Sequence, residues 1–436
     1  MRSDMVSGRV VRTGANRNVS RRTTLRERAD SGWLTADRFV GLTFGICLFL
    51  QRFALPYGSL EVSVATPLVL LLCGWGLMVG VLTVDRRRAA FFLGLVACGL
   101  MATAVHATYP LAIAPRTSLN SLVYWLAMTV FAVLRLSTPM DERRFLSLLA
   151  IMLELVAIAG IAEFVAQLVG LRLFSFSGLV PANLLIERQY DVVAPIPGTG
   201  LLRSNGFFLV EPSVFSQFMA VGVIVEWLVF RRPARLALYL VGLLVSASGS
   251  GWLVLSAFVV ELAFVTGALG ALRALLLTGA CILALALASL VIPDIISALT
   301  SRTGEFTVQG SSAYQRFVTP FMVLTQVLNV APWSIVTGIG PGASEQLLVP
   351  FFYQLNTPVK VMLEYGVPGV LFYLLLLLDA IRTPTQWLLI GPLFVLLMFT
   401  GGYQEFSPIL FPVLLIGTVA LLQPGHSALV PRAKKS

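Results

Sequence analysis

The sequence predicts an all-α protein that crosses a membrane many times. Of its 436 residues, 57% are apolar and 12% are charged, against about 25% charged in soluble domains. Mean hydropathy is +0.87. The apolar residues also gather in runs long enough for a helix to cross a bilayer. These observations exclude a water-soluble domain, a coiled coil and a disordered chain. They predict a polytopic inner-membrane helical bundle of about twelve transmembrane helices.

The predicted transmembrane helices are the apolar runs, because a crossing needs about 20 mainly apolar residues. Two of the connections between the runs are long, at 171–208 and 293–358. Because function often lies on long loops held by a rigid scaffold, these two loops are the first candidates for a site. The runs occupy residues 38–55, 62–83, 89–108, 118–136, 145–170, 209–230, 236–247, 252–270, 274–292, 359–380, 385–400 and 406–423.

Basic residues divide unevenly between the two sides of this bundle. With the N-terminus in the cytoplasm, 23 Lys and Arg fall on the cytoplasmic side and eight on the other. Cytoplasmic loops of membrane proteins carry the excess of Lys and Arg. The asymmetry therefore predicts a multi-pass membrane protein with both termini in the cytoplasm. The loops 171–208 and 293–358 then lie on the opposite, outer side.

The predicted organisation has three parts. Residues 1–37 form a basic, Ser- and Thr-rich tail without apolar periodicity, which indicates cytoplasmic disorder. Residues 38–423 form the transmembrane domain, and residues 424–436 a second cytoplasmic tail. Eight of the 31 Lys and Arg lie in the first tail, so we interpret its charge as a retention signal and the net charge of +10 not as a nucleic-acid surface. The first apolar run is interpreted as a permanent span and not as a cleavable signal peptide.

A run of small residues, Ser-Ala-Ser-Gly-Ser-Gly at 246–251, interrupts the apolar stretch 236–268. One continuous helix would carry Arg235 and Arg273 to opposite sides, whereas the charge asymmetry requires both inside. The chain is therefore expected to turn back at this run. The first arm, 236–247, spans only about 18 Å at 1.5 Å per residue. The broken-helix turn is thus expected below the outer surface, in a cavity lined by protein or water.

The first long loop ends in a charged segment, RSNGFFLVEPS, from Arg203 to Ser213. Pro212 suits the first position of a helix, which makes Glu211 the capping residue. The open N-terminus of this helix carries the positive end of its dipole. Arg203 is near enough in sequence to fold over it, so we interpret this segment as an oxyanion or phosphate site. The alternative is that Arg203 pairs with Glu211 or meets lipid headgroups.

The second long loop carries Arg316 in aromatic surroundings, within a segment, 314–330, that suits an amphipathic helix lying in the membrane interface. The glycine run at 338–342 lacks the Gly-Lys-Ser/Thr ending of a nucleotide loop and is interpreted as a tight turn for close backbone approach. The chain re-enters the membrane at 356–369. Glu364, in the outer half of that span, either faces the site or hydrogen-bonds to its neighbours.

Metal ligands are scarce in this chain. It has two histidines, His106 and His426, and four cysteines that all lie in apolar runs without paired spacing. No Asp-x-Asp and no His-x-x-x-His pattern occurs. We therefore expect no metal site, no disulfide framework and no cofactor. His106 is expected to meet lipid headgroups at the outer end of the third span.

These segments together resemble the bacterial O-antigen polymerase and O-antigen ligase superfamily, which includes Wzy-type exopolysaccharide polymerases. Segment 203–213 is similar to that family's Arg…Gly-x-x-x-x-Glu-Pro-Ser/Asn stretch. Segment 356–369 resembles its His-Asn…Leu-x-Glu-x-Gly-x-x-Gly helix, and Gly338-x-Gly340 the glycine turn before it. Two features of the family are missing: an arginine at the broken-helix turn, and the histidine that its ligase branch carries in the fifth outer loop. The missing histidine favours a polymerase.

The resemblance implies a metal-independent glycosyltransferase that joins polyprenyl-diphosphate-linked oligosaccharides at the periplasmic face of the bacterial inner membrane. The outer loops 171–208 and 293–358 would then be periplasmic. In that reading Arg203, Arg316 and Ser213 bind the diphosphate. Glu211, helped or replaced by Glu364, acts as general base. The implied partners are an undecaprenyl-diphosphate-linked oligosaccharide, membrane lipids, a chain-length regulator and a repeat-unit flippase, and no nucleic acid.

Two other functions stay open at this point. A ligase would transfer the glycan to a lipid or protein acceptor instead of lengthening it. A secondary transporter or flippase for lipid-linked sugars would favour internal repeats and broken helices in both halves. The sequence shows one clear broken helix and no convincing repeat, which disfavours transport.

Overall fold

A computed structural model describes most of the predicted transmembrane domain. The two predicted tails lie almost wholly outside the described residues, as do the predicted span 406–423, most of 385–400 and most of the first long loop. The described ranges are 34–171, 180–186, 201–291, 311–349 and 355–381, with breaks at 58–59, 115, 139 and 266 and a few isolated residues elsewhere.

The described chain is mainly helical, and ten of the predicted spans coincide with a helix or with a helix and its short extension. These helices are α2 (Ala36–Phe49), α3 (Ala65–Met78), α4 (Arg86–Thr108), α5 (Leu119–Thr129), α6 (Glu142–Leu168), α7 (Pro212–Val225), α8 (Pro233–Val245), α9 (Gly249–Val265), α10 (Gly267–Val291) and α15 (Thr357–Ile381). The second long loop adds α12 (Ser312–Phe317), α13 (Thr319–Val330) and α14 (Ser334–Thr337).

Strands are short and lie at the ends of helices. β1 (Ala54–Tyr57) pairs antiparallel with β2 (Leu60–Ser63), and β3 (Leu82–Val84) pairs antiparallel with β4 (Leu134–Leu136). Two short turns extend helices: η1 (Val130–Val133) follows α5, and η3 (Glu226–Phe230) follows α7. Two more, η2 (Ala182–Leu184) and η4 (Ala343–Glu345), lie in the long loops. The prediction of an all-α architecture is therefore confirmed in its main features, with these strands as minor additions.

Within the described residues, five helices are long and apolar enough to cross a membrane: 86–108, 143–168, 212–230, 269–287 and 357–379. Further apolar helices, among them α3, α8, α9 and α13, are shorter. The chain thus has the helices of a membrane protein, whereas the total of twelve crossings stays a prediction.

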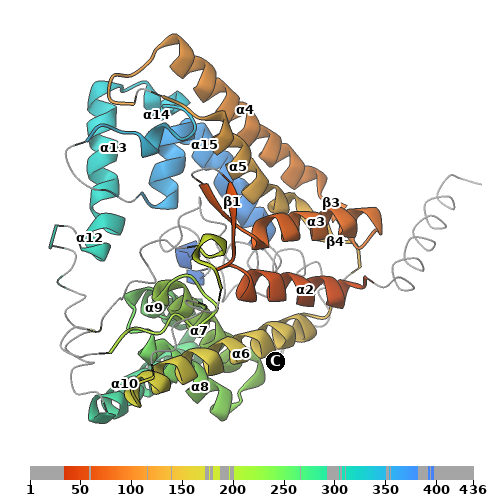
Figure 1. Cartoon of the computed structure of the whole chain (residues 1–436), viewed down its shortest axis with the longest axis vertical. Helices are drawn as coiled ribbons and strands as arrows, with labels where there is room; N and C mark the ends of the chain where they lie inside the picture. The colour runs from red at the N-terminus through yellow and green to blue at the C-terminus, as the bar shows by residue number, and fades with distance from the viewer. Residues whose placement is uncertain are drawn as a thin grey trace, which may run out of the picture.

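Two groups of helices make up the fold (Figure 1). α6 to α10 gather at one end, α4, α5 and α13 to α15 lie at the other, and α2 and α3 lie between them. A large apolar core runs through α2 to α10 and includes α15. A second, smaller core, containing Val323, Val327, Ile339 and Leu363, lies between α13 and α15. α12 and the start of α7 also meet, through an ion pair between Arg316 and Glu211.

The chain reverses direction at the Ser/Gly run, as the charge pattern predicts. α8 runs antiparallel to α7, with Tyr239 packed against Gly222 and Met219 against Gly242. α8 ends at Val245, and α9 begins at Gly249 beside the first turns of α7. The turn is placed by these helix contacts, while its depth in a membrane stays a prediction.

α15 is broken at Gly366, where φ is 70° and ψ is −178°. Pro368 has no N–H to donate to the carbonyl of Glu364. The carbonyl oxygen of Glu364 instead accepts a hydrogen bond from the N–H of Gly340, at 3.1 Å. A Cβ on Gly338 would lie 2.3 Å from the same oxygen, so only glycine allows this approach. The predicted close approach of the glycine turn is confirmed, and its partner is the break in α15.

The expected headgroup contact of His106 is wrong. Its side chain is 5% exposed and lies beside the glycine turn, 3.6 Å from where a Cβ on Gly340 would be. The glycine turn folds back over the end of α4 and covers the imidazole, which the sequence pattern of α4 alone does not reveal.

Candidate functional site

The first part of the site is the start of α7, which forms as the sequence predicts. Pro212 occupies the first helical position and Glu211 is the N-cap. The carboxylate of Glu211 makes no hydrogen bond to the backbone of the helix that it precedes. Instead it accepts a hydrogen bond from the hydroxyl of Ser213. Glu211 therefore lies at the N-terminus of α7, but its carboxylate makes no capping hydrogen bond to the backbone N–H groups there.

The second part is Arg316, which α12 brings from the other long loop. Its Nη2 lies 3.6 Å from Oε2 of Glu211, with side-chain exposures of 20% and 12%. The amide of Asn356 donates to the carbonyl of Arg316 at 3.2 Å and ties α12 to the start of α15. The ion pair is longer than a hydrogen bond and partly desolvated. The structure thus brings together one predicted site residue from each loop.

Arg203 is half-buried, and its Nε has no hydrogen-bond partner among the described residues. Leaving a buried guanidinium N–H unsatisfied costs free energy. The planar guanidinium matches the oxygens of a phosphate, to which it can donate two hydrogen bonds at once. The alternative pairing of Arg203 with Glu211 is not the ion pair found, since Glu211 pairs with Arg316.

The segment around Arg203 is fixed by neighbouring helices. The N–H of Leu202 donates to Gln167 of α6 at 2.8 Å. The N–H of Ser204 donates to the carbonyl of Val245 at 3.1 Å, where α8 ends and the broken-helix turn begins. The residues on either side of Arg203 are therefore both anchored, Leu202 to α6 and Ser204 to the start of the broken-helix turn.

Serine hydroxyls join the broken-helix turn to α7. The hydroxyl of Ser250 donates to the carbonyl of Ser213 at 2.9 Å and lies 2.9 Å from the hydroxyl of Ser216. The N–H of Gly251 donates to Ser216 at 3.0 Å, and a Cβ on Gly251 would lie 2.3 Å from the carbonyl of Ser216. The turn is thus packed directly against the helix end that carries Glu211.

Glu364 belongs to a buried network of its own. It is 1% exposed and accepts a hydrogen bond from the hydroxyl of Ser344. Nζ of Lys360 lies 3.9 Å from Glu364 and 2.6 Å from Glu345. Glu364 thus contacts Ser344 and Lys360, whereas Glu211 contacts Ser213 and Arg316. Of the two acids, Glu211 is the one the structure places beside a predicted phosphate-binding arginine.

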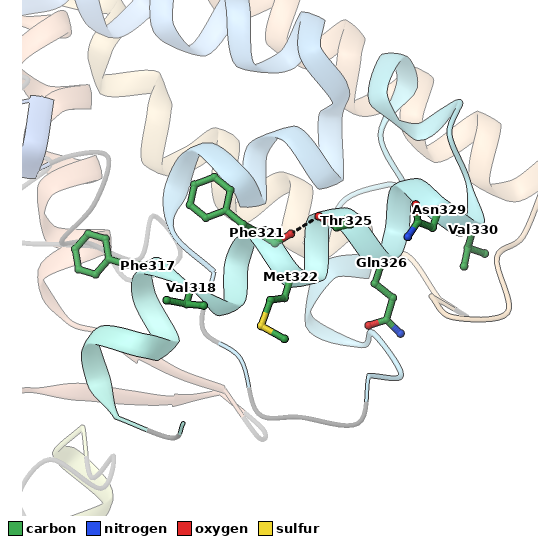
Figure 2. A pocket seen from close by; sticks show the side chains of 8 residues that line it. All are labelled: Phe317, Val318, Phe321, Met322, Thr325, Gln326, Asn329 and Val330. Atoms are coloured by element: carbon green, nitrogen blue, oxygen red, sulfur yellow. Dashed lines mark hydrogen bonds between the residues drawn. The ribbon is translucent and has the colours of Figure 1, made fainter. Parts of the chain in front are cut away.

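An open groove of about 630 Å³ begins one residue after Arg316 and follows α12 and α13 (Figure 2). The opposite face of α13 is buried through Val323 and Val327 in the smaller core. The single amphipathic helix expected over 314–330 is two helices, α12 and α13, and the groove face of the second carries apolar and uncharged polar side chains. The groove is lined by Phe317, Val318, Phe321, Met322, Thr325, Gln326, Asn329 and Val330.

No group of three or more His, Cys, Asp or Glu side chains lies together as a metal site in the ranges that the structure describes. Cys47, Cys73, Cys98 and Cys281 are buried and unpaired in disulfides. The expectation that the reaction needs no metal or cofactor stays a prediction.

Sequence reasoning missed the polar residues that hold the Arg203 segment. Glu163 accepts a hydrogen bond from the hydroxyl of Ser204 at 2.7 Å, and Gln51 accepts one from the N–H of Val210 at 3.4 Å. The available signal was that Gln51 and Glu163 interrupt apolar runs near the predicted outer surface.

A family model described as WcaD colanic acid polymerase matches residues 52–344, more than half of the chain. The match includes Arg203, Glu211, Ser213 and Arg316, and ends before Glu364. No curated protein and no solved structure matches the chain. The family and the apolar helices agree with the resemblance to exopolysaccharide polymerases and imply a lipid-linked oligosaccharide substrate. The chain therefore belongs to the WcaD colanic acid polymerase family and is a membrane-bound polymerase of polysaccharide repeat units.

Proposed function

We propose that the chain transfers polyprenyl-diphosphate-linked oligosaccharide repeat units onto one another at the periplasmic face of the inner membrane. The product is a growing exopolysaccharide or O-antigen chain. The observation that carries this proposal is the pair of Glu211 and Arg316 at an open helix N-terminus, joining the two long loops. A carboxylate beside a guanidinium is what a reaction needs when it removes a proton and releases a diphosphate.

In the proposed step, a sugar hydroxyl of the acceptor unit attacks the anomeric carbon of the donor chain. The bond between that carbon and the diphosphate oxygen breaks, and undecaprenyl diphosphate leaves with the electron pair. Glu211 takes the hydroxyl proton as general base. Arg316, Arg203 and Ser213, with the dipole of α7, stabilise the charge that gathers on the leaving diphosphate.

The ion pair between Arg316 and Glu211 is compatible with a site that binds an anion. At 3.6 Å, Arg316 neutralises Glu211 without holding it in a close hydrogen bond. A bound diphosphate would pair with the guanidinium of Arg316. The carboxylate of Glu211 would then be available to accept the proton of the acceptor hydroxyl. The unsatisfied Nε of Arg203 supplies a further donor for that diphosphate.

The groove on α12 and α13 is the proposed seat of the polyprenyl chain. Its lining residues carry no charge, and a cation, Arg316, precedes it directly. An anionic head followed by an apolar tail matches this order of charge and apolar surface. The donor would then lie with its diphosphate at Arg316 and its tail along Phe321 and Met322.

The change Met322→Asp is expected to weaken the apparent affinity for an undecaprenyl-linked donor about 10-fold, because it places a charge against the apolar tail. A donor carrying a short prenyl chain, which occupies less of the groove, should lose less. Ile335→Asp, in α14, changes an apolar residue outside the groove that is 39% exposed, against 40% for Met322, and is the matched control. Equal losses with both donors, or in both variants, would remove the tail from this groove.

The function itself is tested with the purified chain in proteoliposomes that contain an undecaprenyl-diphosphate-linked repeat unit. We expect a ladder of products that differ by one repeat unit, with release of undecaprenyl diphosphate. In cells, deletion should leave single repeat units where long chains were. Transfer of whole chains to an acceptor without lengthening would show a ligase, and movement of unchanged donor across the bilayer would show a transporter.

A further inference from the structure

Two buried charged residues lie beside the segment that carries Arg203. Glu163, in the last two turns of α6, is 5% exposed, and Arg52, between α2 and β1, is 2% exposed. Their opposite charges interact. Removing a charge from water is costly, and buried apolar residues often stabilise a fold equally well. A buried pair at this place therefore calls for a role other than stability alone.

The carboxylate of Glu163 holds the segment that follows Arg203 through one serine. The hydroxyl of Ser204 donates to it at 2.7 Å. That hydroxyl also accepts the N–H of Gly206 at 3.1 Å, and the N–H of Phe207 donates to Oδ1 of Asn205 at 3.0 Å. These contacts fix the path of the chain directly after Arg203, because each removes a freedom of the backbone.

That path is one the segment would not hold unaided. Gly206 and Phe207 have φ of 76° and 63°, and the left-handed region is unfavourable for phenylalanine. A Cβ on Gly206 would lie 2.6 Å from the ring of Phe215 in α7, so the segment is also pressed against the helix that begins at Glu211. The hydrogen bond from Ser204 to Glu163 helps to offset this strain.

We propose that Glu163, neutralised by Arg52, is a positioning residue that holds the 203–208 segment so that Arg203 presents its guanidinium to the diphosphate. This inference rests on the proposed function. Glu163 touches neither substrate nor reacting atoms; it acts through Arg203. Glu154, which lies earlier in α6, forms an ion pair with Arg235 at 2.8 Å and has no contact with the 203–208 segment among the hydrogen bonds and ion pairs described.

The test measures binding of farnesyl diphosphate, a soluble diphosphate with a short prenyl chain, to the full chain in detergent. Glu163→Gln keeps the size and one acceptor oxygen but removes the charge. We expect about a 10-fold loss of affinity, and no loss for the control Glu154→Gln. Because Glu163→Gln leaves Arg52 buried without its counter-charge, the double change Glu163→Gln with Arg52→Met is measured beside it. It should recover thermal stability but not affinity.

A purely structural role is separated by combining Glu163→Gln with Arg203→Ala. If Glu163 acts through Arg203, the double variant binds no more weakly than Arg203→Ala alone. A further loss of affinity in the double variant overturns the positioning role, as does wild-type affinity in Glu163→Gln. Wild-type affinity in Arg203→Ala itself overturns the diphosphate site, and with it both proposals.

Discussion

Replacing Arg316 with alanine is expected to abolish long polymer while the protein stays in the membrane at its normal level. The change removes the guanidinium that lies 3.6 Å from Glu211 and, in the proposed site, the charge that meets the leaving diphosphate. Loss of one such preorganised group costs about 10²–10³ in rate. The cost in stability is far smaller, because the ion pair is long and partly exposed. The measurement is the size distribution of cell glycan, together with the amount of the variant in membranes.

Two further variants make this result specific. Arg316→Lys keeps the charge but loses the planar fork, so it should recover part of the polymer. Arg116→Ala removes an exposed arginine from a different connection and should leave polymer length unchanged. Arg203→Ala is expected to behave as Arg316→Ala does, because both are assigned to one diphosphate. Wild-type polymer from both alanine variants would refute the site.

Features with a local cause could be predicted from the sequence. The apolar runs predict the order of the helices, and Pro212 predicts that α7 starts there with Glu211 as its N-cap. The Ser/Gly run, together with the placement of Arg235 and Arg273, predicts the reversal between α8 and α9. The glycines at 338–342 predict a close backbone approach. Each of these follows from the conformational limits of a few neighbouring residues.

Features that depend on contacts between distant segments could not be predicted. The residue pattern of the two loops does not predict that Arg316 pairs with Glu211. It also does not predict that Glu163 accepts a hydrogen bond from Ser204, directly after Arg203. Burial of His106 depends on a loop folding back from the second half of the chain. The split between α12 and α13 has a local signal, because Pro320 lies in the first turn of α13, where proline favours a helix start.

Glu211 and Glu364 are the two candidate bases, and their surroundings predict opposite behaviour. Glu211 is the acid beside Arg316, so Glu211→Gln removes the proton acceptor of the proposed step. General-base removal costs about 10²–10⁴ in rate. Glu211→Gln should therefore abolish chain growth with little change in protein level. The measurement is turnover per folded protein in proteoliposomes, across a range of pH.

Glu364→Gln is expected to act mainly on stability. Glu364 is buried with Lys360, and loss of its charge leaves that ammonium, 4% exposed, with Glu345 as its remaining described ion-pair partner. Breaking a buried pair costs about 3–5 kcal/mol when a charge is left uncompensated, and less here because Glu345 stays in place. The variant should therefore be less abundant and melt at a lower temperature, yet each folded molecule should polymerise at more than a tenth of the normal rate. If Glu364→Gln instead loses more turnover per folded molecule than Glu211→Gln, Glu211 is not the base, and the buried network around Lys360 takes its place as the reacting centre.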